Sequence, residues 1–143
     1  MVNKDVLRKK VQYIEANLEK LAYLKQLSSQ EFIEDFRNIE TAKHLLQVSI
    51  EAMLDISNHI IARNRWGTPD KSADSIRLLR EKGYFSEAEE ELFTKMIKFR
   101  NRVVDLYHDI NEKEVYKILQ ENLQDFSRFL KSIAKNNFSN PQK

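Results

Sequence analysis

Apolar residues recur at intervals of three and four through nearly the whole chain, which is the spacing that gives an α-helix one apolar face. A β-sandwich or barrel needs many turn residues, whereas this chain has only two glycines and two prolines among its 143 residues. Because the two glycines lie far apart, glycine-rich phosphate-binding loops are excluded as well. The pattern predicts an all-α protein that needs no strand.

Capping signals divide this pattern into about five helices. In three places a serine or asparagine precedes a glutamate by three positions, the spacing of a capping box: Ser28 and Glu31, Ser86 and Glu89, and, more weakly, Asn111 and Glu114. Gly83 has the character of a C-terminal helix stop. We expect helices over residues 4–27, 28–62 (with room for a bend near Arg37), 73–82, from 86 past Leu106, and 111–133.

The segments that connect these helices indicate how the helices pack into a domain. Residues 63–71 contain the only tryptophan, one glycine and one proline, and they form the clearest loop. The other connections are short, so neighbouring helices are expected to run antiparallel and pack as a bundle. The length suits one domain. We expect a single helical domain over residues 1–135 and a flexible C-terminal tail over residues 136–143.

Composition excludes several classes of site. The absence of cysteine rules out disulfides, thiolate metal sites and a cysteine nucleophile, and it suits a reducing cytoplasm. The three histidines lack the spacing of metal ligands, so we expect neither a metal nor another cofactor. Charged residues begin near the N-terminus and no apolar stretch approaches bilayer length, so we expect no signal peptide and no membrane span.

The densest polar cluster lies in the fourth expected helix, between residues 95 and 109. On a continuous helix Arg100 and Tyr107, seven residues apart, share one face, and Arg102 and Asp105 are neighbours that can pair. An exposed helix end with basic residues near the negative end of its dipole would explain such a cluster. An arginine beside an apolar stripe, however, usually has a functional role at the surface where helices or subunits pack together.

Residues 99–107, Phe-Arg-Asn-Arg-Val-Val-Asp-Leu-Tyr, resemble the signature of the HepT toxins, a branch of the HEPN domain superfamily. That signature is an arginine, four residues, a histidine, one residue and a tyrosine, usually with an asparagine after the arginine. Arg100, Asn101 and Tyr107 match it. The helix around residues 45–61 and the Gly-Thr-Pro loop also look like this family, so the resemblance covers most of the chain.

The resemblance implies both an activity and partners. In the family, two subunits pair so that both signature helices line one cleft, which implies a homodimer that forms through the helix carrying Arg100. The implied activity is that of a metal-independent endoribonuclease, with tRNA as the substrate by family analogy. Arg100, with Asn101 beside it, would steady the charge on the scissile phosphate while the histidine moves protons. The implied partner is an MNT-type nucleotidyltransferase antitoxin, which silences the toxin by transferring AMP to Tyr107.

Asp105 stands where the signature has its histidine. An imidazole titrates near pH ~6.5 and can both accept and return a proton at neutral pH, whereas an aspartate in water titrates near about 3.9 and stays a carboxylate. Asp105 also adds negative charge beside a polyanionic substrate. We therefore expect impaired cleavage, and the alternative is a catalytically inactive HEPN helical module that binds RNA or a nucleotidyltransferase partner.

A second register of the signature stays open. The looser HEPN pattern allows four to six residues between arginine and histidine, and Arg102 with His108 satisfies it. Around a continuous helix these two are separated by roughly 120°, and Arg100 and Asp105 by roughly 140°, so direction does not decide between the pairs. The additional matches to asparagine and tyrosine favour the register that starts at Arg100.

Asp55, Asn58 and His59 form the remaining cluster, within little more than one helical turn. Asp55 and His59 are four residues apart and share one face. One interpretation is a polar network that ties helices together, because buried polar groups need partners. The other, implied by the resemblance, places the three residues near the cleft, where they support its arginines.

Overall fold

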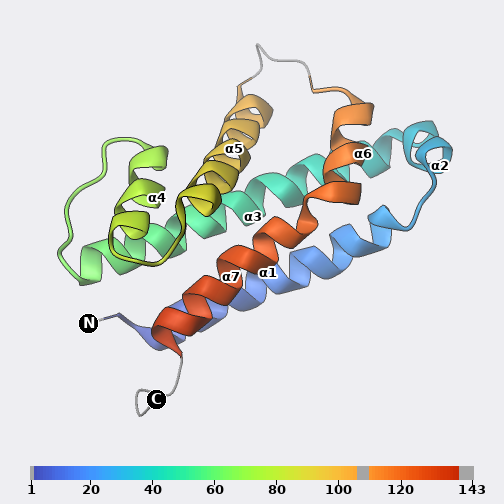
Figure 1. Cartoon of the computed structure of the whole chain (residues 1–143). Coiled ribbons are helices and arrows are strands. Elements are labelled where there is room, and N and C mark those ends of the chain that lie inside the picture. The colour runs from blue at the N-terminus through green and yellow to red at the C-terminus, as the bar shows by residue number, and fades with distance from the viewer. Residues whose placement is uncertain (1, 106–109, 139–143) are drawn as a thin grey trace.

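The computed structural model describes residues 2–105 and 110–138, and every regular element within them is a helix. The all-α prediction is confirmed. The helices, coloured along the chain in Figure 1, are α1 Lys4–Lys25, α2 Ser29–Glu34, α3 Phe36–Arg63, α4 Ser72–Glu81, α5 Glu87–Val104, α6 Glu112–Glu121 and α7 Leu123–Asn137.

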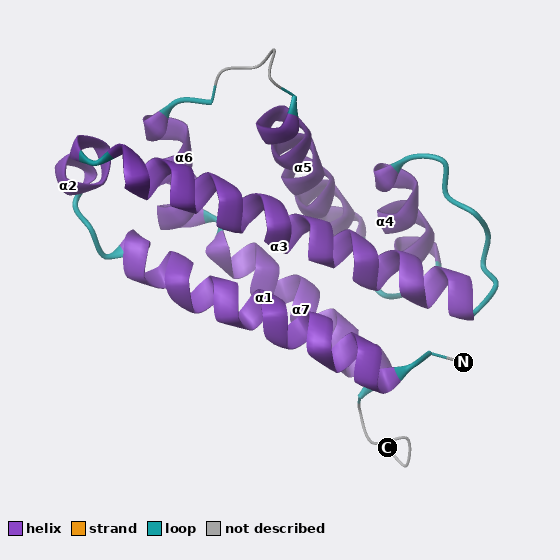
Figure 2. Cartoon of the chain, turned by 180° about the vertical axis from the view of Figure 1, so that it is seen from behind, coloured by secondary structure: helices purple, strands orange, loops and turns teal. Residues whose placement is uncertain are grey.

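The longest helix, α3, forms the centre of the bundle and contacts α1, α2, α4, α5 and α6. Figure 2 shows α1 and α3 side by side, with α7 behind α1 and with α4 and α5 against the far side of α3. The start of α1 and the end of α7 lie at the same end of the bundle (Figure 1). α3 therefore occupies the middle of the core.

The buried faces of the helices are those of the apolar stripes. Leu7, Ile14 and Leu21 of α1 are completely buried, as the spacing of seven residues between them predicts. A cluster of aromatic rings joins α5 to α7, where the centroids of Phe93 and Phe129 are 5.5 Å apart in an edge-on arrangement. This packing fixes the direction of α5 and, with it, the position of the signature residues at its end.

Two of the five expected helices are each divided, so the described residues contain seven helices. The expected helix over residues 28–62 breaks at Asp35, whose backbone is extended (φ −119°, ψ 107°) and whose side chain accepts a hydrogen bond from the amide of Arg37. The expected helix over residues 111–133 breaks at Asn122 (φ −122°, ψ 1°). Both residues favour helix ends, because their side chains compete for backbone hydrogen bonds.

The expected helix from residue 86 past Leu106 ends earlier than predicted, because α5 ends at Val104. Asp105 has an extended backbone (φ −83°, ψ 109°) and forms the C-cap of α5. The helical angles that compared the two signature registers therefore do not apply. Tyr107 and His108 lie outside the described residues.

Gly83 ends α4 as predicted, with a φ of +87° that side chains rarely tolerate. The amide of Tyr84 donates to the carbonyl of Leu79 at 2.9 Å, which satisfies an acceptor left free at the helix end. This turn leads the chain into Ser86, whose hydroxyl caps α5 by accepting from the amide of Glu89 at 3.1 Å. The local turn chemistry thus determines where α5 begins.

At the C-terminal end, α7 continues to Asn137, two residues into the segment expected as a tail, and residues 139–143 lie outside the described part. Among the described helices, none is both long and apolar enough to cross a bilayer.

Candidate functional site

Arg100 lies in the last turns of α5 beside the buried Phe99, and a carboxylate from α3 holds its guanidinium. Its Nε donates to Oε2 of Glu51 at 3.0 Å, and its Nη2 lies 2.9 Å from the same oxygen. Its Nη1 donates to Oδ1 of Asn101 at 3.1 Å. The predicted site residues Arg100 and Asn101 are thus in direct contact, on a helix end that the core packing of α5 positions.

Glu51 is a site residue that the sequence did not reveal. It lies 49 residues before Arg100, and no local spacing connects the two. Its Oε2 also accepts a hydrogen bond from Nε2 of Gln47 at 3.1 Å, one turn earlier on α3. The side chains of Arg100 and Glu51 are 28% and 32% exposed, so the pair is partly shielded from water and the guanidinium keeps a defined orientation.

Arg102 points to a different helix and makes a two-pronged ion pair with Glu114 of α6. Nη1 of Arg102 lies 2.5 Å from Oε2 of Glu114, and Nη2 lies 2.9 Å from Oε1. The hydrogen bond to Glu114 raises the pKa of Arg102, and the charge of the carboxylate adds to this. Glu114 also donates its amide to Oδ1 of Asn111 at 2.8 Å, so the predicted cap of α6 is confirmed. The end of α5 is thereby tied to the start of α6.

Asp105 directly follows α5 and is half-buried. Its amide donates to the carbonyl of Asn101 at 2.9 Å, which closes the last turn of the helix. Arg100, Asn101 and Asp105 therefore gather at the C-terminal end of α5. Tyr107 of the Arg100 register and His108 of the alternative pair with Arg102 lie outside the described residues.

Asp55, Asn58 and His59 each tie α3 to a different part of the bundle. Asp55 forms a 3.6 Å ion pair with Lys10 of α1. Asn58 accepts a hydrogen bond from the hydroxyl of Ser75 in α4 at 2.5 Å. These contacts are the kind that a polar network between helices makes. The carboxylate that contacts Arg100 belongs to Glu51.

His59 is held as a neutral acceptor. Its Nε2 accepts a hydrogen bond from the amide of Asn3, just before α1, at 3.2 Å. The pKa of His59 is lowered, first by burial and then by the positive charges of Arg63 and Lys10. Protonation would remove the lone pair that accepts from Asn3 and would place a third positive charge beside these two residues.

We expect His59 to make the protein less stable as the pH falls below about 6.5, the value of an unperturbed histidine. The sign follows because the unfolded chain binds a proton in this range more readily than the folded chain does. The measurement is the melting temperature of the unaltered protein and of His59→Gln between pH 7.5 and pH 5. The melting temperature of the variant should fall less steeply over this range, and His44→Gln is the matched control. Equal slopes in the unaltered protein and His59→Gln would contradict the assignment.

The chemical capacity of the site comes from a fixed cation and a nearby carboxylate. Arg100, oriented by Glu51, is placed to stabilise negative charge that develops on a phosphate. Asp105 offers a carboxylate, which is a weaker base than the imidazole of the signature. Within the described ranges, no group of three or more His, Asp or Glu side chains is arranged to hold a metal ion.

The model of the family described as "Ribonuclease HepT-like" matches residues 14–133. The mRNA nuclease HepT of Shewanella oneidensis is 30% identical over 129 residues, which cover 90% of this chain and 96% of the relative. The tRNA nuclease HepT of Aphanizomenon flos-aquae is 24% identical over 131 residues, covering 90% of this chain and 87% of the relative. Both similarities include α5 and its partner helices α3 and α6.

Solved structures resemble the whole bundle. The tri-AMPylated HEPN toxin of Shewanella oneidensis, in complex with its MNT antitoxin, superposes with a TM-score of 0.84 at 28% identity and covers 90% of this chain and 96% of its own. A toxin–antitoxin crystal structure with AMP-PNP gives a TM-score of 0.83 at 27% identity, covering 90% of this chain and 97% of its own. The arrangement of helices seen here is therefore that of toxins that have been crystallised with antitoxins.

Proposed function

The chain belongs to the ribonuclease HepT-like family of HEPN toxins, and from this premise we propose that it is the toxin of a HEPN/MNT toxin–antitoxin pair. Its activity is that of a metal-independent endoribonuclease in the cytoplasm, and this copy is impaired by Asp105. The observation that carries the proposal is the guanidinium of Arg100, fixed by Glu51 at 2.9 Å beside Asn101 at the end of α5. The substrate is RNA, since one similar protein is named an mRNA nuclease and the other a tRNA nuclease.

The proposed reaction needs one group that accepts a proton and one that returns it. The ribose 2′-hydroxyl gives up its proton and attacks the phosphorus, the bond to the 5′-oxygen breaks, and that oxygen takes a proton. Arg100 stabilises the charge on the phosphate oxygens during this step. The carboxylate of Asp105 is a weaker base than an imidazole, so it takes the first proton less readily, and little of the protonated acid forms to supply the second.

Growth of cells tests the proposed function as a whole. We expect cells to tolerate expression of the unaltered chain and to stop growing when they express Asp105→His. Co-expression of the cognate MNT-type nucleotidyltransferase should restore growth. Normal growth with Asp105→His at equal protein level, in cells without the nucleotidyltransferase, would contradict the toxin assignment.

We expect a homodimer whose seam includes the end of α5, so that two copies of Arg100 face one cleft. This proposal is supported by Val104, an apolar side chain that is 48% exposed at the same end of the helix. Light scattering should give about twice the 17.0 kDa mass of one chain. Val104→Asp should shift the protein toward monomer, whereas Tyr23→Asp on the exposed surface of α1 should not. A monomer at tens of micromolar would count against a shared cleft.

Tyr107 is the proposed acceptor of AMP. The hydroxyl groups of two other tyrosines are engaged in the fold, because Tyr84 donates to Asn137 at 3.4 Å and Tyr116 donates to the carbonyl of Leu27 at 2.8 Å. Phosphates added at Tyr107, seven residues after Arg100 in the chain, would repel RNA. After treatment with the nucleotidyltransferase, ATP and Mg²⁺, mass spectrometry should find AMP adducts that disappear in Tyr107→Phe. Adducts that persist in this variant would move the acceptor to another tyrosine.

A second candidate function is favoured by Asp105 itself. A chain without an acid–base histidine can serve as a HEPN helical module that binds RNA or the nucleotidyltransferase without cutting. In that case RNA binding weakens as salt rises, since phosphate contacts release counterions, and no variant at position 105 produces cleavage. Cleavage by Asp105→His decides between the two candidates.

A further inference from the structure

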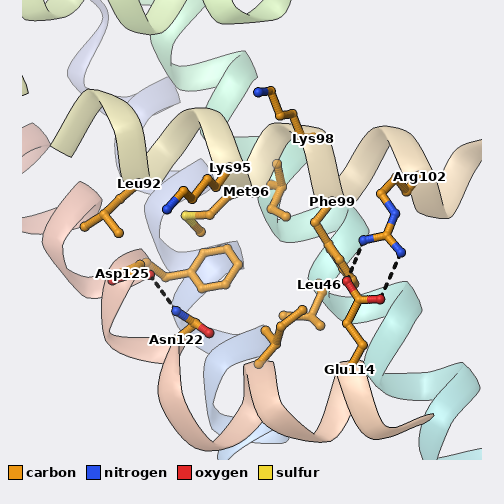
Figure 3. Close-up of a pocket in the computed structure, with 13 residues that line it drawn as sticks. Leu46, Leu92, Lys95, Met96, Lys98, Phe99, Arg102, Glu114, Asn122 and Asp125 are labelled. Atoms are coloured by element: carbon orange, nitrogen blue, oxygen red, sulfur yellow. Dashed lines mark hydrogen bonds and ion pairs between the residues drawn. The ribbon is translucent and has the colours of Figure 1, made fainter. Parts of the chain in front are cut away.

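A cavity of about 280 Å³ lies between α3, α5, α6 and α7, and Arg102 is one of the residues that line it. Its walls are mainly apolar and include Ile50 of α3, Met96 and Phe99 of α5, and Phe126 of α7. Figure 3 shows that Arg102 and Glu114 flank one end of this space and that Asn122 and Asp125 lie at the other. The cavity therefore combines apolar walls with a few polar groups, which is typical of ligand sites.

Asp125 is the unusual residue of this cavity. It lines the cavity from the first turn of α7 and is only 5% exposed. Its Oδ2 accepts a long hydrogen bond of 3.3 Å from Nδ2 of Asn122, and among the described residues no cation lies within ion-pair distance of it. The positive end of α7 favours an acid there. A nearly buried carboxylate with a single neutral partner still has capacity for further N–H donors.

We propose that this cavity binds one guanine base of the RNA substrate, with Asp125 as the residue that recognises it. A carboxylate accepts two parallel N–H bonds, and guanine is the standard base whose Watson–Crick edge presents two adjacent donors, N1–H and the 2-amino group. Phe99 and Phe126 line the cavity with the small part of each ring that is exposed, and a base in the cavity can contact them there. The volume admits one base but not a folded RNA element.

The position of the cavity relative to the candidate site supports this occupant. Arg102 lines the cavity and lies two residues after Arg100, on the same helix. Lys95 and Lys98 also line the cavity, and Figure 3 shows the ammonium of Lys98 directed away from it. A strand that meets the positive charges along α5 therefore has a base-sized space beside Arg102. The inference rests on the proposed function, since it names the base that a ribonuclease of this kind would select.

Equilibrium binding tests the inference separately from cleavage. The probes are fluorescent 2′-O-methyl oligouridines with one central guanine, adenine or hypoxanthine, which cannot be cut because the nucleophilic hydroxyl is blocked. We expect the guanine probe to bind roughly 10-fold or more tightly than the adenine probe, the scale of one good two-pronged base contact. Hypoxanthine, which keeps N1–H and lacks the 2-amino group, should fall between them.

Two variants attribute this preference to the cavity. Asp125→Asn, which removes the charge and keeps the shape, should abolish the preference for guanine and leave the base-independent affinity. Met96→Trp, which fills the cavity without changing charge, should do the same. Asp70→Asn, on an exposed loop, is the matched control and should change nothing. Melting curves verify that each variant is folded, and the second variant keeps the test decisive if Asp125→Asn is unstable.

Three results would overturn the inference. Equal binding of all probes would mean that no base is recognised, and a guanine preference that survives both variants would place recognition elsewhere. If either variant instead changes the oligomeric mass measured in solution while probe binding stays the same, the cavity binds a second copy of the chain. The proposed function fails on a different measurement, the lack of cleavage by Asp105→His, so the two failures are distinguishable.

Discussion

Replacing Asp105 with histidine is expected to raise the rate of RNA cleavage by about 10²–10⁴-fold, the usual contribution of a positioned acid–base group. The reason is the basicity of the group that takes the first proton. At pH 7 an imidazole is basic enough to take the proton of the 2′-hydroxyl and, once protonated, can return it to the leaving oxygen, whereas a carboxylate is a weaker base and takes that proton less readily. The measurement is the initial rate of cleavage of labelled cellular RNA in EDTA, with equal amounts of each protein.

The backbone at position 105 accommodates this replacement. Asp105 forms the C-cap of α5 in an extended conformation that suits any residue. The hydrogen bond to the carbonyl of Asn101 comes from the backbone amide of Asp105 and does not involve its side chain. His108→Ala is the control and should leave the rate unchanged in either background. Brisk cleavage by the unaltered protein that stops in His108→Ala would show that Arg102 and His108 are the working pair.

Removing the guanidinium of Arg100 from the active variant is expected to reduce cleavage by about 10²–10³-fold, the range for losing one oriented group that stabilises transition-state charge. The experiment compares Asp105→His with Asp105→His/Arg100→Ala under single-turnover conditions. Arg100→Lys should recover only part of the rate, since an ammonium keeps the charge but lacks the forked geometry that Glu51 orients.

Arg102→Ala in the same Asp105→His background distinguishes a structural role of Arg102 from a catalytic one. This change breaks the pair with Glu114, so the link between α5 and α6 weakens and the melting temperature should fall. If Arg100 is the catalytic arginine, the rate measured at a temperature where the variant is folded should fall far less than with Arg100→Ala. The opposite order of the two losses would assign catalysis to Arg102.

Most helix starts could be predicted because they depend on contacts within a few residues. Ser28, Ser86 and Asn111 each accept a hydrogen bond from the amide three positions later, so neighbouring side chains alone specify where α2, α5 and α6 begin. The buried stripes follow from the helical period for the same reason. The sequence therefore determined the all-α class and the order of the main helices.

The helix breaks were harder to predict, because an apolar stripe can run on through them. At Asp35 and Asn122 the residues on both sides pack against the same core, so the spacing of apolar positions does not record the change of direction. At Asp105 the expected helix ends although Val103 and Val104 continue the apolar pattern. Whether a helix continues at such points depends on what the next segment packs against, which is a tertiary property.

Some residues of the candidate site could likewise be predicted from the sequence, and others could not. Arg100, Asn101 and Asp105 are near one another in sequence, so a short motif was enough to single them out. Glu51 and Asp125 came only from the tertiary structure, because 32% of the residues are charged and the sequence does not state which of them meet. Side-chain periodicity specifies which face of a helix is buried. The pairing of α3 with α5, and the space left between α5 and α7, depend on how complete helices fit together.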